Sequence, residues 1–126
     1  MQHERHYTLE EATDALGAVA RLLAVMRDAR ALLTDEQARE ALAEAGPTNG
    51  GGPPGRQVSE AFVGLRAAAA QLQAMEVVVR DLDRGLVDFP AILDGNEVYL
   101  CWVESEEDGI GYWHDLESGY AGRHPL

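Results

Sequence analysis

The spacing of apolar residues in this 126-residue chain changes once, near Leu86, from a helical period to an alternating one. Before that point, apolar residues recur every three to four positions, which is typical of helices that bury one face. After it, β-branched and aromatic residues form short runs separated by turn residues, which indicates strands. The pattern predicts one α+β domain over residues 1–126, with a long antiparallel helical hairpin followed by a small three-stranded antiparallel sheet.

The first helix is expected over residues 8–45, and it begins at a capping box. Thr8 can accept a hydrogen bond from the backbone of the first turn, and Glu11, three residues on, can reach back to the backbone of Thr8. A second capping-box pattern, Thr34-Asp35-Glu36-Gln37, lies within the predicted helix. The helix therefore either restarts there with a kink or runs straight through, and both alternatives stay open.

Residues 46–55 hold five glycines and three prolines, a composition that cannot continue a helix and predicts a flexible loop. A second helix is expected over 57–83, followed by Gly85 as the left-handed residue after its end. Apolar residues spaced by four and three form its expected seam with the first helix: Val58, Phe62, Leu65, Ala69, Leu72, Met75 and Val79.

A small sheet is expected over residues 86–115. Asp94-Gly95 favours a type I′ turn and joins two strands as a β-hairpin, and a third strand is expected over 110–114. With Val103 opposite Ile110, one face presents Val98, Leu100, Trp102 and Trp113, and the other Tyr99, Cys101, Val103, Ile110, Tyr112 and His114. Both faces are largely apolar. The helical hairpin can cover one of the two faces, so the other needs the C-terminal tail 116–126, a ligand or a second subunit as its cover.

Charge and cysteine content restrict the partners and the compartment. The net charge is −12, and all ten cations are arginines, so nucleic acid and an anionic membrane surface are both disfavoured as partners. One cysteine, Cys101, cannot form an intramolecular disulfide, which favours a reducing compartment. Residues 1–11 are polar and lack the apolar core of a signal peptide. We therefore expect a cytoplasmic protein.

Four stretches resemble a known family. They are Tyr7-Thr8-Leu9-Glu10-Glu11-Ala12, Asp81-Leu82-Asp83-Arg84-Gly85-Leu86-Val87-Asp88-Phe89-Pro90, Leu100-Cys101-Trp102, and Tyr112-Trp113-His114-Asp115 leading to Gly119-Tyr120-Ala121-Gly122-Arg123. In these the chain resembles the small bacterial proteins grouped as domain-of-unknown-function family 2203. The resemblance implies a bacterial cytoplasmic protein with the same order of helices and sheet. Since the family has no established activity, the resemblance carries over no catalytic residue.

The C-terminal third concentrates the chemically interesting side chains. The candidate ligand-binding residues are Asp88, Trp102, Trp113, His114, Asp115 and Arg123. Aromatic walls with a histidine, carboxylates and an arginine could hold a small ligand. We favour a packing role, in which Arg123 folds back to Asp115, Asp83 or Asp88 and holds the tail over the sheet. A metal site could use His114, Asp115 and Glu117 with Asp88, whereas Cys101 is expected to be a small buried hydrophobe.

These patterns lead to two hypotheses about function. The first is a non-enzymatic cytoplasmic binding or assembly module that acts as a homodimer, because a two-helix hairpin leaves apolar residues such as Leu22, Val25 and Val63 without cover. The alternative is a small-ligand- or metal-dependent enzyme with its site in the C-terminal cluster.

His3 and His6 precede the first helix, and we expect them to lie on a frayed end.

Overall fold

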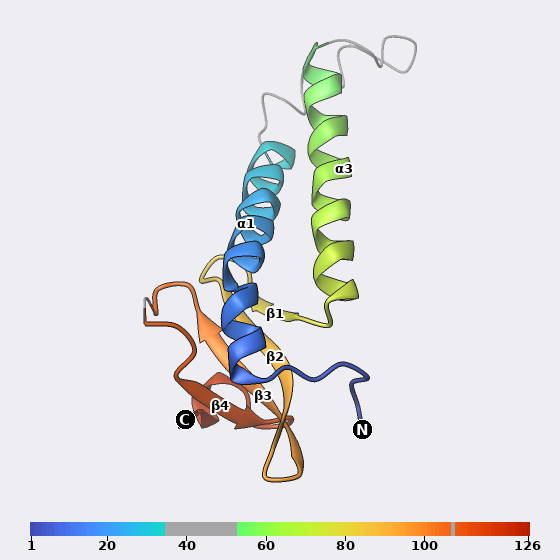
Figure 1. Ribbon diagram of the computed structural model, residues 1–126. Helices are drawn as coiled ribbons and strands as arrows, with labels where there is room; N and C mark the ends of the chain where they lie inside the picture. The colour runs from blue at the N-terminus through green and yellow to red at the C-terminus, as the bar shows by residue number, and fades with distance from the viewer. Residues whose placement is uncertain (35–52, 107) are drawn as a thin grey trace.

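The computed structural model describes residues 1–34, 53–106 and 108–126, which form two helices beside an antiparallel sheet (Figure 1). Helix α1 spans Leu9–Leu33, with Thr34 as its C-cap. The predicted capping box is confirmed, because the Thr8 hydroxyl accepts from the Glu11 backbone N–H and the Glu11 carboxylate accepts from the Thr8 backbone N–H. The expected continuation of this helix to residue 45, its possible restart after Thr34 and loop residues 46–52 lie outside the described residues.

Helix α3 spans Pro53–Ala74, so both of its predicted bounds are wrong. Its first turn begins inside the predicted loop, where proline is tolerated because the first N–H groups of a helix have no intrahelical acceptor. At the other end Glu76 takes a left-handed conformation with φ of 58°. The Val77 N–H then donates to the Leu72 carbonyl at 3.1 Å, which is typical of a Schellman motif. The chain leaves the helix there and turns into the sheet.

The sheet has five strands rather than the predicted three, and the order β1-β2-β3-β4-β5 follows the chain. The strands are β1 (Val78–Asp81), β2 (Leu86–Leu93), β3 (Asn96–Val103), β4 (Tyr112–Asp115) and β5 (His124–Pro125), and every neighbouring pair is antiparallel. The additional strands replace two predicted elements. β1 lies within the predicted second helix, and β5, with the short 3-10 helix η2 (Tyr120–Gly122), lies within the predicted tail.

Valine accounts for the extra first strand. Three consecutive valines, Val77 to Val79, begin the segment, and β-branched side chains favour an extended backbone over a helix. Gly85, predicted to follow the helix, instead lies in the turn between β1 and β2 with φ of 66°. A Cβ atom at that position would collide with the side chain of Glu104. Glycine is therefore favoured at position 85 both by the positive φ and by the lack of space for a side chain.

The central hairpin agrees with the sequence pattern. Asp94 and Gly95 form the two-residue turn between β2 and β3 with φ values of 51° and 80°, as a type I′ turn requires. β3 pairs with β4 in the predicted register, with Tyr99 beside His114. The third predicted strand is displaced, because β4 begins at Tyr112 rather than at residue 110.

The two faces of the sheet have different covers. The helix face packs with α1 in the main core and comprises Val87, Phe89, Val98, Leu100, Trp102 and Trp113. Figure 1 shows α1 crossing the sheet on this side, while α3 stands beside α1 and runs in the opposite direction. The tail face comprises Asp88, Tyr99, Cys101, Tyr112 and His114. Ile110, predicted for the tail face, belongs to the core on the helix side.

The N-terminal segment is anchored rather than frayed. The Tyr7 N–H donates to the Pro90 carbonyl at 2.7 Å. Pro90 lies beyond the residues of β2 that pair with β1, so β2 is an edge strand at this point. Proline is tolerated on an edge strand because no neighbouring strand needs its missing N–H. The backbone N–H groups of Gln2 and His3 donate to the Glu97 carboxylate at 2.7 and 3.0 Å. Neither helix, within the described ranges, is long and apolar enough to cross a membrane.

Candidate functional site

Three buried polar side chains from neighbouring strands meet on the tail face. Asp88 of β2 and Cys101 of β3 are cross-strand partners, and His114 of β4 pairs with Tyr99, two residues before Cys101 on the same face. Each of the three is 1% exposed, and their ligand atoms all lie within 4.8 Å of one another. We call Asp88, Cys101 and His114 the Asp–Cys–His cluster.

Both ring nitrogens of His114 face groups that accept hydrogen bonds. Nδ1 lies 2.6 Å from the backbone carbonyl oxygen of Asp115, so Nδ1 carries a proton and donates. Nε2 lies 2.9 Å from Oδ1 of Asp88. Without a positive charge between them, the lone pair of Nε2 would face a lone pair of the carboxylate oxygen. One cation, either a proton or a metal ion, must therefore lie between Nε2 and Oδ1.

Arg80 of β1 completes the environment of Asp88. Its Nε donates to Oδ2 of Asp88 at 2.9 Å, so each carboxylate oxygen has its own partner. The guanidinium of Arg80 also lies over the ring of Tyr99, 5.1 Å from the ring centre. Arg80 is 42% exposed while Asp88 is 1% exposed, so the pair connects a buried charge to the surface.

Cys101 is not a ready nucleophile. Burial raises the pKa of its thiol to about 12, and the neighbouring Asp88 carboxylate adds to this rise. A thiolate is therefore scarce at neutral pH, and the thiolate is the reactive form. Nη1 of Arg123 lies 4.0 Å from the sulfur atom and opposes the rise in pKa.

A small cavity of about 220 Å³ lies against the cluster on the tail face. Its wall includes all three cluster side chains and, from the C-terminal segment, Glu117 and Tyr120. That segment therefore lies over this face, which is one of the three covers that the sequence left open. The cavity connects groups that are themselves buried to a space large enough for several water molecules or a small ligand.

The predicted site residues divide between the two faces. Asp88 and His114 are together, and Glu117 lines the same cavity. Trp102 and Trp113 belong to the core on the helix face, so they do not wall the cavity. The Asp115 side chain is exposed and accepts a hydrogen bond from Ser118, while its backbone carbonyl orients His114.

Arg123 has a different partner from those predicted. Its Nη1 donates to Glu106 at 2.9 Å, not to Asp115, Asp83 or Asp88, and its guanidinium lies 4.0 and 4.2 Å from the ring centres of Tyr112 and Tyr120. These contacts join the tail to the turn after β3 and to β4, and they are compatible with the packing role that the sequence favours.

Sequence reasoning missed Cys101 as a member of the cluster and Arg80 as the partner of Asp88. The predicted second helix includes Arg80, and the predicted role of Cys101 is that of a small buried hydrophobe. The register available from the sequence already placed Tyr99 beside His114, and therefore Cys101 near His114 on one face. That was the signal that could have found Cys101.

A second candidate surface lies on the helix pair, as we call α1 and α3. Phe62 and Val63 of α3 are 51% and 66% exposed, and Val25 of α1 is 44% exposed. A hollow of about 530 Å³, whose lining includes Ala29 and Gly64, runs between the two helices. The helix pair therefore exposes several large apolar side chains.

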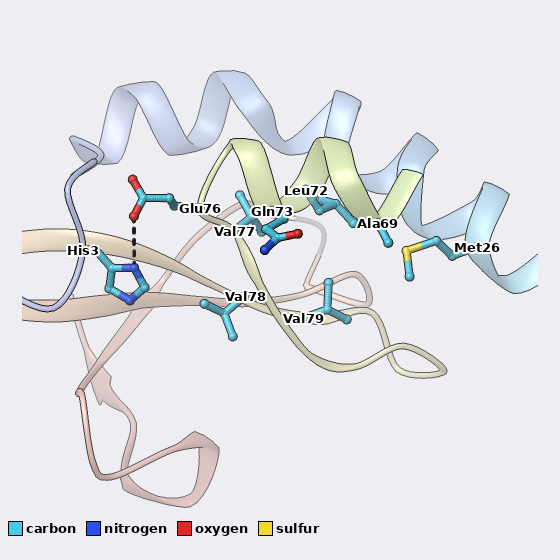
Figure 2. A pocket seen from close by; sticks show the side chains of 9 residues that line it. All are labelled: His3, Met26, Ala69, Leu72, Gln73, Glu76, Val77, Val78 and Val79. Atoms are coloured by element: carbon cyan, nitrogen blue, oxygen red, sulfur yellow. Dashed lines mark ion pairs between the residues drawn. The ribbon is translucent and has the colours of Figure 1, made fainter. Parts of the chain in front are cut away.

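A further apolar hollow of about 450 Å³ lies where the helix pair meets β1. Figure 2 shows Met26 of α1, Ala69 of α3 and Val79 of β1 around it. At its rim His3 and Glu76 form an ion pair with 3.4 Å between Nδ1 and Oε1. This hollow continues the exposed apolar surface of α3 toward the sheet.

These features define an α+β protein with a helix pair on one face of a five-stranded antiparallel sheet and a buried polar cluster on the other. The chain belongs to the family described as "Uncharacterized conserved protein (DUF2203)", whose profile matches residues 5–126. This match confirms the resemblance seen in the sequence. No curated protein and no solved structure matches the chain.

Proposed function

We propose that this protein is a non-enzymatic cytoplasmic assembly module that acts as a homodimer, with the helix pairs of two copies forming a four-helix bundle. The observation that carries the proposal is an apolar stripe on α3. The sequence predicts its residues as part of the seam with the first helix, but in the fold Phe62 and Ala69 are exposed and Val58 and Leu65 are half-buried. This outer stripe comprises Val58, Phe62, Leu65 and Ala69. Ala68 and Leu72 of α3 are buried, and Leu72 belongs to the main core.

The spacing of the outer stripe is that of a helix–helix seam. Its members recur at intervals of four, three and four residues, the repeat that lets one helix insert side chains between those of another. Phe62, at its centre, is 51% exposed, and burying the exposed half of this side chain in a partner would contribute about 1 kcal/mol.

Charge favours a second copy as the occupant. The two helices hold five acidic residues and five arginines, so the helix pair is neutral, whereas residues 78–125 hold eleven acidic residues and three arginines. Two neutral helix pairs can meet without net repulsion. An antiparallel bundle also keeps the two acidic sheets at opposite ends, where their mutual repulsion is weakest.

The available area is close to what a stable dimer needs. At 1.5 Å per residue, α1 with 25 residues and α3 with 22 residues are about 33–37 Å long. Two adjacent helices present a face about 20 Å wide, or roughly 700 Å² per copy. Standard interfaces bury about 800 Å² per partner, so the helix pair supports a dimer of moderate affinity.

Sedimentation equilibrium across micromolar dilution tests this proposal. The wild-type protein is expected at the mass of two chains, and Phe62→Glu at the mass of one chain with an unchanged far-ultraviolet circular dichroism spectrum. Ile92→Glu is the matched control, because Ile92 is 41% exposed but lies on β2, outside the helix pair. A wild-type protein that stays monomeric at every concentration would overturn the proposal, as would dissociation caused equally by Ile92→Glu.

The single buried thiol supports the cytoplasmic part of the proposal, since a free cysteine is most stable in a reducing compartment. The alternative function is a ligand- or metal-dependent enzyme with its site in the C-terminal cluster, and it is supported by the short contacts of His114 with Asp88 and with the Asp115 carbonyl. Binding at that cluster is independent of the helix pair, so both properties can coexist in one protein.

A further inference from the structure

We propose that Asp88, Cys101 and His114 bind one divalent transition-metal ion of the Zn²⁺ type on the tail face of the sheet. The donor set is one imidazole nitrogen, one carboxylate oxygen and one thiolate sulfur, which are the three ligand types that Zn²⁺ takes in proteins. Sulfur and imidazole together select a late transition metal over Mg²⁺ or Ca²⁺, which prefer oxygen ligands only.

The distances suit a tetrahedral site. With Zn–N and Zn–O bonds near 2.1 Å and a Zn–S bond near 2.3 Å, ligand atoms lie about 3.3–3.8 Å apart. The three ligand atoms here lie within 4.8 Å of one another, and Nε2 of His114 is 2.9 Å from Oδ1 of Asp88. Side-chain rotations that move the ligand atoms by about 1 Å convert the metal-free arrangement into the tetrahedral one. Adjacent strands hold all three residues, so the backbone need not move.

The hydrogen bond at Nδ1 prepares His114 as a ligand. Histidines that bind metals characteristically donate their other ring N–H to a backbone carbonyl or a carboxylate, which fixes the tautomer and aims the free nitrogen. Here the carbonyl of Asp115 accepts that hydrogen bond at 2.6 Å and directs Nε2 at Asp88. The cation that must lie between Nε2 and Oδ1 is then the metal ion, in place of a proton.

Arg80 performs the corresponding task for Asp88. Its Nε holds Oδ2 at 2.9 Å and leaves Oδ1 for the metal ion. On binding, the proton between His114 and Asp88 and the proton on the Cys101 sulfur both leave to solvent. One thiolate and one carboxylate then balance the two positive charges of the ion, and the partly exposed Arg80 guanidinium adds one positive charge at the edge of the site.

The cavity beside the cluster supplies the remaining coordination position. It is about 220 Å³ and includes Glu117 and Tyr120 in its wall, so a water molecule or an anion can occupy the fourth site. Three protein ligands with one open position distinguish reactive or exchangeable zinc sites from closed structural ones. The rival interpretation is that the cluster is a metal-free buried network of His114, Asp88 and Arg80.

Titration of the chelator-treated, full-length protein with Co²⁺ separates these interpretations. We expect tetrahedral d–d bands and a thiolate-to-cobalt charge-transfer band, both saturating at one equivalent and both removed by Zn²⁺. Because the chain has a single cysteine, a charge-transfer band identifies Cys101 as a ligand. Absence of that band at several equivalents of Co²⁺ would overturn the proposal.

Variants assign the other ligands. Cys101→Ser is expected to abolish the charge-transfer band, and His114→Gln to weaken Co²⁺ binding by at least the 10–100-fold that loss of an outer-shell partner causes. His124→Gln is the matched control, since His124 is exposed and lies on the neighbouring strand β5. Equal binding by His114→Gln and wild type would place the metal elsewhere and refute the site.

A measurement on the wild-type protein covers the case in which these variants do not fold. In ¹⁵N NMR of the histidine rings, the metal-free protein should show His114 protonated at Nδ1, with the second proton at Nε2 or shared with Asp88. Saturating Zn²⁺ should remove that second proton and shift the Nε2 resonance, while Nδ1 keeps its own. An Nε2 resonance that Zn²⁺ leaves unchanged contradicts the proposal.

Discussion

The sheet and the helix pair bury their side chains to very different extents. The first six residues of β2 and the last six of β3 are buried, including the charged Asp88. In α3, by contrast, Phe62 and Val63 are exposed. This difference indicates that the packing of α1 on the sheet stabilises the single chain, while the outer surface of the helix pair is available for association. Substitutions in the two regions should therefore affect different measurements.

The largest effect is expected from truncating a phenylalanine of the sheet. Phe89→Ala removes a ring that is fully buried and packs edge-to-face on Tyr7, with 5.2 Å between ring centres. We expect the free energy of unfolding to fall by about 3–5 kcal/mol, because the ring leaves a cavity in the core. Urea denaturation followed by circular dichroism measures it.

Phe62→Ala is the matched substitution in the helix pair. It should change the stability of the single chain by less than about 1 kcal/mol, since half of the ring is exposed, and should instead weaken the dimer. Both variants are compared at a concentration where their association state has been measured. If the two substitutions cost the same stability in the monomer, the contrast between the regions is wrong.

The next effect concerns Asp88, an acidic side chain that is buried in the sheet. Asp88→Ala leaves His114 without its partner and frees Arg80, and we expect a loss of about 3 kcal/mol in the presence of a chelator. Arg80→Ala should cost less, about 1 kcal/mol, because Arg80 is 42% exposed. Thermal and urea unfolding measure both. A smaller loss for Asp88→Ala than for Arg80→Ala would show that the buried carboxylate is not the centre of the network.

Arg123→Ala separates the packing role of the tail from a ligand-binding role. The substitution removes the ion pair with Glu106 and the stacking on Tyr112 and Tyr120, so we expect a loss of about 1–2 kcal/mol. Arg84→Ala is the control, because Arg84 is exposed and also lies over Tyr120, at 4.8 Å. Unchanged stability of Arg123→Ala would favour the alternative in which Arg123 serves a ligand.

The central hairpin and the start of α1 could be predicted because their signals are local. Asp94-Gly95 specifies a type I′ turn, and the turn fixes the pairing of β2 with β3. The capping box at Thr8 and Glu11 likewise lies within four residues of sequence. Each prediction needed no knowledge of distant parts of the chain.

The end of α3 could not be predicted because distant residues stabilise it. Glutamate disfavours the left-handed conformation that Glu76 adopts, and glycine is the usual residue there. The Glu76 carboxylate accepts the backbone N–H groups of Glu4 and Arg5 at 3.2 and 2.7 Å, contacts that only the folded chain provides. Because the predicted helix extends too far, it includes Arg80, and the contact of Arg80 with Asp88 cannot be predicted. The sequence signal that favours a strand here is the run of three valines at 77–79, because β-branched residues favour an extended backbone.

The smallest effect is expected where the N-terminal segment meets the sheet. The hydrogen bond from His6, together with the backbone N–H groups of His3 and Gln2, lowers the pKa of Glu97 to about 2. Since this value lies below the ordinary 4.5, the ionised carboxylate stabilises the fold above about pH 4.5. That contribution disappears as the pH falls from 4.5 toward 2.

Glu97→Gln tests this contact. The variant should be less stable than wild type at neutral pH, and the difference between their free energies of unfolding should shrink as the pH falls from 4.5 toward 2. Glu60→Gln is the control, because Glu60 is exposed on α3 and should show no such convergence. Urea denaturation at a series of pH values measures all three proteins. A difference that stays constant through this range would mean that Glu97 anchors the segment through its shape and not through its charge, and the N-terminal segment would then hold to the sheet equally well in acid.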